Sequence, residues 1–447
     1  MLQSIINGIK KTNIEIYIAI ISLLSLLGWI ISYNAFVTLA LILVFILIYV
    51  KKNPLYFILG LITIIFSYNT KYSFDFPIEV AIFSTLLLIY LMYIIYKNIK
   101  KATIDPTMIF LIVASILSFV TIIWNNSILL EHPMLFIIIF AWPLYLLLYI
   151  AFKVIMKKDS IHYVLLILKY LGLLLSLEVL YSAFTGQNSN FLMCDYNLGW
   201  GVCNEAGILL CFLAPIVAYL FIKTKNSYLK LFNLFILFLM AFAIIATGSR
   251  GSYLFGGIEA IAIFIIILIY SRRRLLISSI VITGLVTAVT IIFITTGLQF
   301  KDFIANAFYN GFDDSGRFTL WRLGLSIWDN NFLTNVFGSG MVSYFSKGEL
   351  PFYEPNVYIV YHSSFIQILV TFGTLGLFLG FIHQVHKYFM LLNIDKCLAL
   401  FIFVGYITVE VYGLIDNTYG MYYFMPLLFI LMVSIEKNGK DKSLILF

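Results

Sequence analysis

The chain has 447 residues, of which 62% are hydrophobic and 11% are charged, and its formal net charge is +7. Soluble globular proteins average about 45–50% apolar and about 25% charged residues, so this chain has too few polar residues to cover a water-facing surface. The composition excludes a soluble enzyme, a disordered protein and a small disulfide-stabilised protein. It predicts a polytopic membrane protein.

Long, continuously apolar runs predict membrane-spanning helices and not the strands of a β-barrel. A spanning helix needs about 20 apolar residues, whereas a barrel strand alternates over about 10. Inside lipid the backbone must satisfy its own hydrogen bonds, and a helix does this within one segment. We therefore predict an all-α polytopic membrane protein with about fourteen transmembrane helices, twelve and thirteen being the alternatives. The predicted spans are 14–31, 36–50, 55–68, 78–96, 107–124, 133–152, 161–184, 204–222, 229–247, 252–270, 275–297, 363–383, 397–415 and 420–435.

The placement of basic residues orients these helices. Lys and Arg collect on the cytoplasmic side of short loops. With the N-terminus inside, every second loop is basic, and these inner segments hold 21 of the 28 Lys and Arg residues. Fourteen spans then place both termini in the cytoplasm. The positive net charge follows from this topology and gives no reason to expect nucleic acid as a partner.

Two loops on the outer side stand out. The longer one covers about 298–361, which is far longer than an ordinary connection of about 4–6 residues. It is therefore predicted to form a large helical extracytoplasmic cap. The shorter one carries Cys194 and Cys203. A disulfide between these two cysteines and a pair of free thiols are both compatible with an outer loop.

Arg250 is the first outer basic residue that departs from the charge rule. It lies in the sequence Thr-Gly-Ser-Arg-Gly at 247–251, between two predicted spans that have almost no loop between them. Arginine costs about 2.5–3.5 kcal/mol at the centre of a spanning helix. The flanking glycines allow a tight turn and close approach of a ligand. Position alone leaves two interpretations open, a bound anion and an arginine that snorkels from a helix end.

Arg317 is the second outer basic residue that departs from the charge rule. It opens a predicted amphipathic helix that runs to about Asp329, with Ser315 as its N-cap. At 3.6 residues per turn, Arg322 falls on the solvated face of this helix, opposite the face that carries Arg317. One face combines a charge with aromatic and small residues, namely Arg317, Trp321, Gly324, Leu325 and Trp328. A cation–π contact with Trp321 would give Arg317 a structural role. A guanidinium beside the free N–H groups of a helix start favours an anion site.

His362 ends the cap loop directly before the next predicted span. A histidine of near-neutral pKa can accept a proton from a hydroxyl group. The adjacent acids Asp313 and Asp314 are interpreted as satisfying a helix N-terminus, so no metal site is expected. Inside the spans, Lys169, Glu178, Glu259 and Glu410 are predicted to be either paired charges or cavity-lining groups, and Lys169 is deep enough to approach Glu259.

In their order along the chain, these residues resemble the O-antigen ligase and O-antigen polymerase family of bacterial membrane glycosyltransferases. The resemblance covers about 204–380, and the N-terminal half matches only in its number of helices. Ser363 follows the histidine where the family more often has Asn. The matching positions are Asn204; Thr247, Ser249, Arg250 and Gly251; Gly316, Arg317 and Trp321; Gly338 and Gly340; and His362 and Ser363, followed after nine residues by Gly373 and Gly376.

The resemblance implies a GT-C-like glycosyltransferase that needs neither a metal nor another cofactor. Its substrate would be a glycan on undecaprenyl pyrophosphate, transferred on the outer face of the bacterial cytoplasmic membrane. His362 would act as the catalytic base, and Arg250 and Arg317 would bind the pyrophosphate. The secondary candidates for the site are Arg322, Ser249, Trp321 and Asn204.

The function expected from this resemblance is polymerisation of lipid-linked repeat units into a cell-surface polysaccharide. A ligase that moves the glycan to another envelope acceptor is the alternative, and a lipid-linked sugar flippase is a weaker one, since inverted repeats and broken midplane helices are not visible. The implied partners are membrane lipids, a flippase and a chain-length regulator. We divide the chain into N-terminal transmembrane helices, 1–203, and a catalytic transmembrane region, 204–447, that includes the cap loop.

Overall fold

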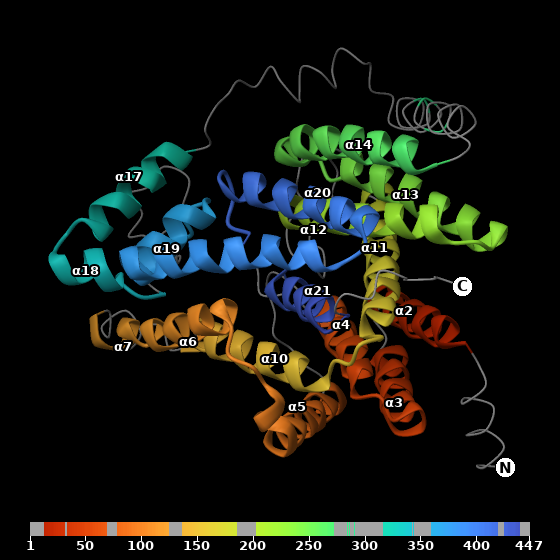
Figure 1. The fold of residues 1–447 in the computed structure, drawn as a ribbon, viewed down its shortest axis with the longest axis horizontal. Coiled ribbons are helices and arrows are strands. Elements are labelled where there is room, and N and C mark those ends of the chain that lie inside the picture. Colours follow the sequence, from red (N-terminus) through yellow and green to blue (C-terminus); the bar gives the residue numbers. More distant parts are fainter. Residues whose placement is uncertain are drawn as a thin grey trace.

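The computed structural model confirms an all-helical membrane protein. It describes residues 13–31, 34–68, 78–124, 136–185, 203–271, 316–341, 359–418 and 424–438, together with 284, 286, 290 and 343. In these ranges every long regular element is an α-helix and no strand is present (Figure 1). Among the described residues, ten helices are long and apolar enough to cross a membrane.

In the N-terminal part of the fold, the described residues form nine α-helices and two short 3₁₀ turns, η1 (Pro54–Tyr56) and η2 (Ile99–Lys101). The α-helices are α2 (Ile14–Ile31), α3 (Asn34–Lys51), α4 (Phe57–Tyr68), α5 (Ile78–Asn98), α6 (Pro106–Ser118), α7 (Val120–Trp124), α9 (Phe136–Ile139), α10 (Ala141–Ile155) and α11 (Ser160–Thr185).

The C-terminal part contains the remaining described helices and the 3₁₀ turn η5 (Leu391–Asn393). Its helices are α12 (Cys203–Lys223), α13 (Ser227–Ala246), α14 (Arg250–Tyr270), α17 (Arg317–Trp328), α18 (Phe332–Phe337), α19 (Ser364–Met390), α20 (Lys396–Gly413) and α21 (Phe424–Asn438). Helices α17 and α18 belong to the predicted cap, which confirms that part of the long outer loop is helical.

The structure does not confirm the count of fourteen spans. Helix α4 has 12 residues and α10 has 15. At 1.5 Å per residue they measure about 18 Å and about 22 Å, short of the ~30 Å hydrocarbon thickness. The predicted span 133–152 is divided between α9 and α10, and the predicted span 275–297 lies almost entirely outside the described residues.

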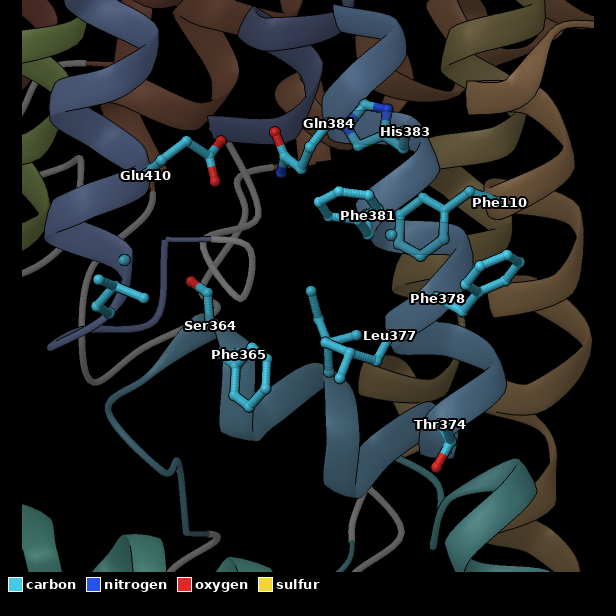
Figure 2. A pocket seen from close by; sticks show the side chains of 14 residues that line it. Phe110, Ser364, Phe365, Thr374, Leu377, Phe378, Phe381, His383, Gln384 and Glu410 are labelled. Atoms are coloured by element: carbon cyan, nitrogen blue, oxygen red, sulfur yellow. The ribbon is translucent and has the colours of Figure 1, made fainter.

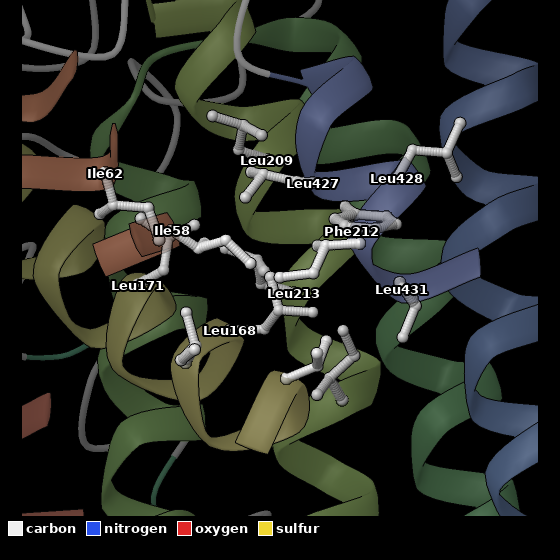
Figure 3. Close-up of a cluster of buried hydrophobic side chains, with 14 of the residues drawn as sticks. Ile58, Ile62, Leu168, Leu171, Leu209, Phe212, Leu213, Leu427, Leu428 and Leu431 are labelled. Atoms are coloured by element: carbon white, nitrogen blue, oxygen red, sulfur yellow. The ribbon is translucent and has the colours of Figure 1, made fainter. Parts of the chain in front are cut away.

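Helix α12 forms the centre of the bundle. It packs against α11, α13, α14 and α20, and nearly every side chain along it is buried. Figure 3 shows Leu209, Phe212 and Leu213 of α12 among leucines of α11 and α21 and isoleucines of α4. A helix that is apolar all round is suited to such a position, where close packing and not exclusion of water holds neighbouring helices together.

The buried lysines of the described helices are paired with carboxylates, but Lys169 is not paired with Glu259. Lys169 forms an ion pair with Glu15 at the start of α2, so the predicted approach to Glu259 is wrong. Glu259 instead hydrogen-bonds with the thiol of Cys211 on α12. Glu410 of α20 pairs with Lys387 of α19. These partners satisfy lysines that would be costly to leave alone inside the membrane.

The predicted span 363–383 is found as one candidate span, Ser364–Asn393, and helix α19 within it is interrupted at Gly373. Gly373 has φ +67° and ψ −169°, which separates a segment 364–372 from a segment 374–390. The break frees carbonyl groups that an unbroken helix would use internally. Ser339 N–H donates to the Val370 carbonyl at 2.7 Å, and Gly340 N–H donates to the Thr371 carbonyl at 3.0 Å. The cap is therefore attached to α19 through backbone hydrogen bonds.

Two glycines of the family-like motifs are required by this attachment. A Cβ on Gly373 would lie 2.3 Å from the Val336 carbonyl oxygen, and a Cβ on Gly338 would lie 2.3 Å from the Thr371 carbonyl. Both glycines also have positive φ angles. The two motifs thus meet in space and serve the docking of the cap.

Replacing Gly373 by alanine is expected to lower the thermal melting temperature of the purified protein in detergent. The left-handed backbone alone makes the alanine unfavourable by about 1–3 kcal/mol, and the contact with Val336 adds to this. Gly257→Ala is the matched control, because nothing lies within 4 Å of that site on α14. The control should melt at or slightly above the wild-type temperature. Equal melting of all three proteins would contradict this account of the attachment.

Candidate active site

The turn before α14 carries Arg250 at the first position of the helix. Gly248 has φ +72°, which allows the tight reversal between α13 and α14. Ser249 is the N-cap of α14, accepting a hydrogen bond from Ser252 N–H. Ser249 Oγ also donates to Asn204 Oδ1 at 2.6 Å, which joins this turn to the start of α12. Arg250 is exposed beside these buried groups.

Tyr412 on α20 supports the same turn from the other side, and sequence analysis missed it. Its hydroxyl lies 2.8 Å from Ser249 Oγ and 3.4 Å from Ser252 Oγ. Since the one hydroxyl proton of Ser249 goes to Asn204, Tyr412 must be the donor to Ser249. Gly251 is needed here because a Cβ would lie 2.7 Å from the Tyr412 hydroxyl.

His362 is held by a carboxylate that sequence analysis also missed. Its Nδ1 lies 3.3 Å from Asp416 Oδ1. The Nδ1–H tautomer donates to Asp416 and leaves the lone pair on Nε2, the atom that could accept a proton. The imidazole is 36% exposed, whereas the Asp416 side chain is 11% exposed. His362 has φ +46°, an uncommon conformation for a residue other than glycine and a mark of a constrained site.

The C-terminal end of α20 and the turn after it connect these two parts of the candidate site. Asp416 N–H donates to the Tyr412 carbonyl at 3.0 Å, so the two side chains are one turn apart. The backbone carbonyl of Asp416 accepts from Ser364 N–H at 3.1 Å, and Thr418 N–H donates to Ser364 Oγ at 2.9 Å. One short segment thus positions the arginine turn through Tyr412 and the histidine through Asp416.

The structure confirms that the helix carrying Arg317 begins at this residue, but the predicted N-cap is wrong. Gly316, with φ +75°, occupies the N-cap position of α17, and Ser315 lies outside the described residues. Arg317 is half-buried and Arg322 is exposed, in agreement with the predicted faces. The secondary candidate Arg322 therefore lies apart from the packed side of the helix.

The packed stripe of α17 differs from the predicted one at Leu325. This side chain is exposed, and Leu320 takes its place in the core because it faces Tyr361 and the start of α19. A Cβ on Gly324 would lie 3.0 Å from the Tyr361 ring, so α17 packs closely on the residue before the histidine. Trp321 packs at the edge of this cluster, and its buried indole N–H has no hydrogen-bond partner in the described part of the chain.

A cavity of about 470 Å³ lies between α19 and α20. Figure 2 shows Gln384 and Glu410 at the top of the view and Ser364 below Glu410, with Phe365 beneath Ser364 and with Phe378 and Phe381 on the opposite side. Ser364 is two residues from His362, so the cavity begins next to the histidine. Phe378, which lines the cavity, is 60% exposed, and this places one wall on the outer surface of the bundle. The lining is mostly apolar, and its polar side chains are those of Ser364, Thr374, His383, Gln384 and Glu410.

Cys203, the first residue of α12, is disulfide-bonded. The structure therefore decides between the two alternatives for this cysteine, although its predicted partner Cys194 lies outside the described residues. Cys211 and Cys397 are free and buried. In the described ranges, no group of three or more His, Cys, Asp or Glu residues is placed to hold a metal ion.

Residues 235–381 match the family model described as O-Antigen ligase. This third of the chain is similar to an O-antigen ligase domain. The match covers about a third of the chain and includes Arg250, Arg317 and His362. Asn204, together with the α20 residues that hold the site, lies outside it. No curated protein sequence matches the chain. Members of the family are glycosyltransferase-like membrane enzymes that use lipid-linked glycans.

Tyr412→Phe is expected to lower the melting temperature of the protein. The change removes the donor to Ser249, and a hydrogen bond of this kind contributes about 0.5–1.5 kcal/mol. Tyr406→Phe is a matched control on the same helix, because the buried Tyr406 hydroxyl has no partner among the described residues. The control should be neutral or stabilising. A Tyr412→Phe protein as stable as the control would contradict the assigned hydrogen bond.

The disulfide at Cys203 can be tested by counting thiols. The chain has four cysteines, of which Cys211 and Cys397 are free. Denatured protein should therefore react with maleimide at two positions without a reductant and at four after reduction, as measured by intact mass. Four reactive thiols before reduction would show that Cys203 is free in the isolated protein.

Proposed function

We propose that this chain transfers a glycan from undecaprenyl pyrophosphate to a sugar hydroxyl on the outer face of the bacterial cytoplasmic membrane, acting as a polymerase of lipid-linked repeat units. The observation that carries the proposal is the arrangement at the outer end of α20. There Asp416 holds His362, while Tyr412 holds the turn that presents Arg250. A candidate base and a candidate anion-binding group are thus positioned by one segment of the chain.

The two arginines would bind the pyrophosphate of the donor. Arg250 is exposed at the first position of α14, and Arg317 occupies the same position in α17. Guanidinium groups bind phosphate oxygens through two parallel hydrogen bonds, and the N–H groups of a helix start also favour an anion. Positive charge placed there stabilises the leaving lipid pyrophosphate as negative charge develops on it.

His362 would act on the acceptor. Its Nε2 takes the proton of the attacking sugar hydroxyl while the oxygen bonds to the anomeric carbon of the donor. The bond from that carbon to the pyrophosphate oxygen breaks at the same time, so the configuration inverts and the lipid pyrophosphate leaves. Asp416 accepts the Nδ1–H hydrogen bond and stabilises the imidazolium that forms. The residues alone supply the proton transfer and the positive charge of this step.

The cavity between α19 and α20 supports a lipid-linked donor. It begins at Ser364, next to the proposed base, and its mostly apolar lining suits a hydrocarbon chain. The exposed Phe378 on its wall would let such a chain enter from the bilayer without crossing water. The lipid chain would then be held in the membrane while its pyrophosphate reaches the arginines.

The catalytic region is placed at 204–447, and its site at the extracytoplasmic side. Asn204 and Asp416 contact site residues from outside the matched family region, which supports a region larger than the match. The disulfide at Cys203, directly before Asn204, supports an oxidising compartment for this end of the bundle. With that orientation, both chain termini are cytoplasmic.

The identity of the acceptor separates the two forms of this function. In a polymerase the acceptor hydroxyl belongs to a second lipid-linked repeat unit, and in a ligase it belongs to a different envelope glycan or lipid. The description of the matching family model, O-Antigen ligase, favours the ligase as the second candidate. Both forms use the same base and the same arginines.

His362→Ala is expected to reduce transfer by about 10²–10⁴-fold, the usual contribution of a general base. Arg250→Ala and Arg317→Ala should also reduce transfer strongly, because the leaving group loses a positive charge. Arg322→Ala is the matched control, since this arginine is exposed on the solvated face of α17. The assay uses purified protein in nanodiscs with lipid-pyrophosphate-linked repeat units, with and without EDTA.

The products decide between the candidates. A ladder of longer chains from repeat units alone supports the polymerase, whereas transfer only after a separate glycan or lipid acceptor is added supports the ligase. Full activity of His362→Ala would overturn the assigned base, and loss of activity in EDTA would overturn metal-independent transfer. No transfer with either acceptor would overturn the enzyme proposal and favour transport of the lipid-linked sugar.

A further inference from the structure

The helices α17 and α18 of the cap expose large apolar side chains. Phe332 is 77% exposed, Phe318 is 58% exposed and Leu333 is 51% exposed. These residues lie outside the small core that α17 forms with Tyr361. A helical pair surrounded by water would carry polar residues at such positions, because a contiguous apolar surface usually marks contact with a protein or a membrane.

The depth of α18 relative to the membrane follows from its attachment to α19. Thr374 Oγ1 donates to the Asn335 carbonyl at 2.9 Å, which joins α18 to the first residue after the break in α19. The segment 374–390 that follows is 17 residues long by its numbering, or about 25 Å at 1.5 Å per residue, close to the hydrocarbon thickness. Thr374 therefore lies near the outer edge of the hydrocarbon, and α18 lies beside it.

The exposed side chains of the cap are next to a lipid-facing surface. Phe378 and Phe381 follow Thr374 by four and seven residues, so all three share one face of α19. Both phenylalanines are at least 60% exposed. Since this part of α19 spans the bilayer, its exposed aromatic face contacts lipid. The Asn335–Thr374 hydrogen bond joins α18 to the first residue of that face, so the exposed Leu333 is two residues from a contact with the lipid-facing helix.

We propose that α17 and α18 form an interfacial anchor that rests in the outer leaflet, with Phe332 and Leu333 among the acyl chains. The partner is the phospholipid surface itself. An amphipathic helical segment with aromatic and aliphatic residues on its apolar side lies in the interface plane in this way. Arg322, which is exposed on α17, can reach the headgroup phosphates through its long side chain.

The anchor explains where Arg317 is held. This residue begins α17, whose Trp328 is linked to α18 by a hydrogen bond from its indole N–H to the Asn335 carbonyl. With α18 at the membrane surface, Arg317 lies near headgroup depth, where the pyrophosphate of a lipid-linked sugar would also lie. This consequence rests on the proposed function, whereas the membrane contact itself does not.

Fluorescence quenching can measure the membrane contact directly. Leu333→Cys is labelled with bimane in full-length protein in phospholipid nanodiscs. The native free cysteines Cys211 and Cys397 are buried and stay unlabelled in the folded protein. Quenching is measured with nitroxide-labelled lipid and with aqueous iodide. Phe378→Cys is the lipid-facing control, and Lys225→Cys, which is exposed in the turn after α12, is the aqueous control.

We expect label at Leu333→Cys to be quenched by nitroxide lipid as strongly as label at Phe378→Cys and to be protected from iodide. Iodide quenching equal to that of Lys225→Cys would overturn the proposal, since the cap would then lie in water. Protection from both quenchers would also overturn it, because a protein surface would then cover α18. None of these readings requires catalytic activity, so they stay informative if the proposed transfer reaction is wrong.

A second variant tests the consequence for substrate binding. Leu333→Ser should raise the KM for a long-chain lipid-linked donor severalfold and leave kcat near the wild-type value, because the proposed base and arginines are unchanged. Phe403→Ser, an exposed position on α20 away from the cap, is the control for a general loss of apolar surface. An unchanged KM in a protein that elutes as a single folded peak would overturn the role of the anchor in holding Arg317.

Discussion

The break in α19 at Gly373 is the constraint on which the outer half of this protein depends. A helix that is interrupted near the hydrocarbon edge frees backbone carbonyls, and lipid cannot hydrogen-bond them. Here the N–H groups of Ser339 and Gly340 satisfy the carbonyls of Val370 and Thr371. The hydrogen bonds that repair the helix therefore also attach the cap to α19.

A second constraint comes from buried polar groups that link distant helices. Lys169 of α11 pairs with Glu15 of α2, and Lys387 pairs with Glu410 across α19 and α20. A charge left without a partner inside the membrane would be far more costly than a paired one. The polar contacts thus restrict which helices can be neighbours, while close packing around α12 fills the space between them.

The candidate site combines both kinds of constraint. The C-terminal end of α20 contributes a hydroxyl from Tyr412, and the turn after it contributes a carboxylate from Asp416. Each contacts a different segment of the candidate site. Tyr412 also explains Gly251, because no side chain would fit against its ring. The local rigidity of one helix end thereby sets the relative position of a turn with an arginine and a loop with a histidine.

The sequence by itself determined the membrane class and the helical architecture. It also determined which residues depart from the apolar pattern of the spans. Lipid as a solvent forces long apolar runs and excludes charge from them, so Arg250, Arg317 and His362 are visible as outliers on the outer side. The structure agrees with the predicted start of α17 and with the exposed position of Arg322. The count of fourteen spans was less secure, because an apolar run does not show where a helix stops.

Only the tertiary structure decided which residues hold the segments of Arg250 and His362 in place. Tyr412 and Asp416 resemble ordinary residues at the end of a span, and nothing in the local pattern links Tyr412 to Ser249, which is 163 residues away. The break at Gly373 and the pairing of Lys169 with Glu15 were hidden for the same reason. Local sequence reports how each segment meets the solvent, whereas a contact between distant segments depends on how the whole bundle packs.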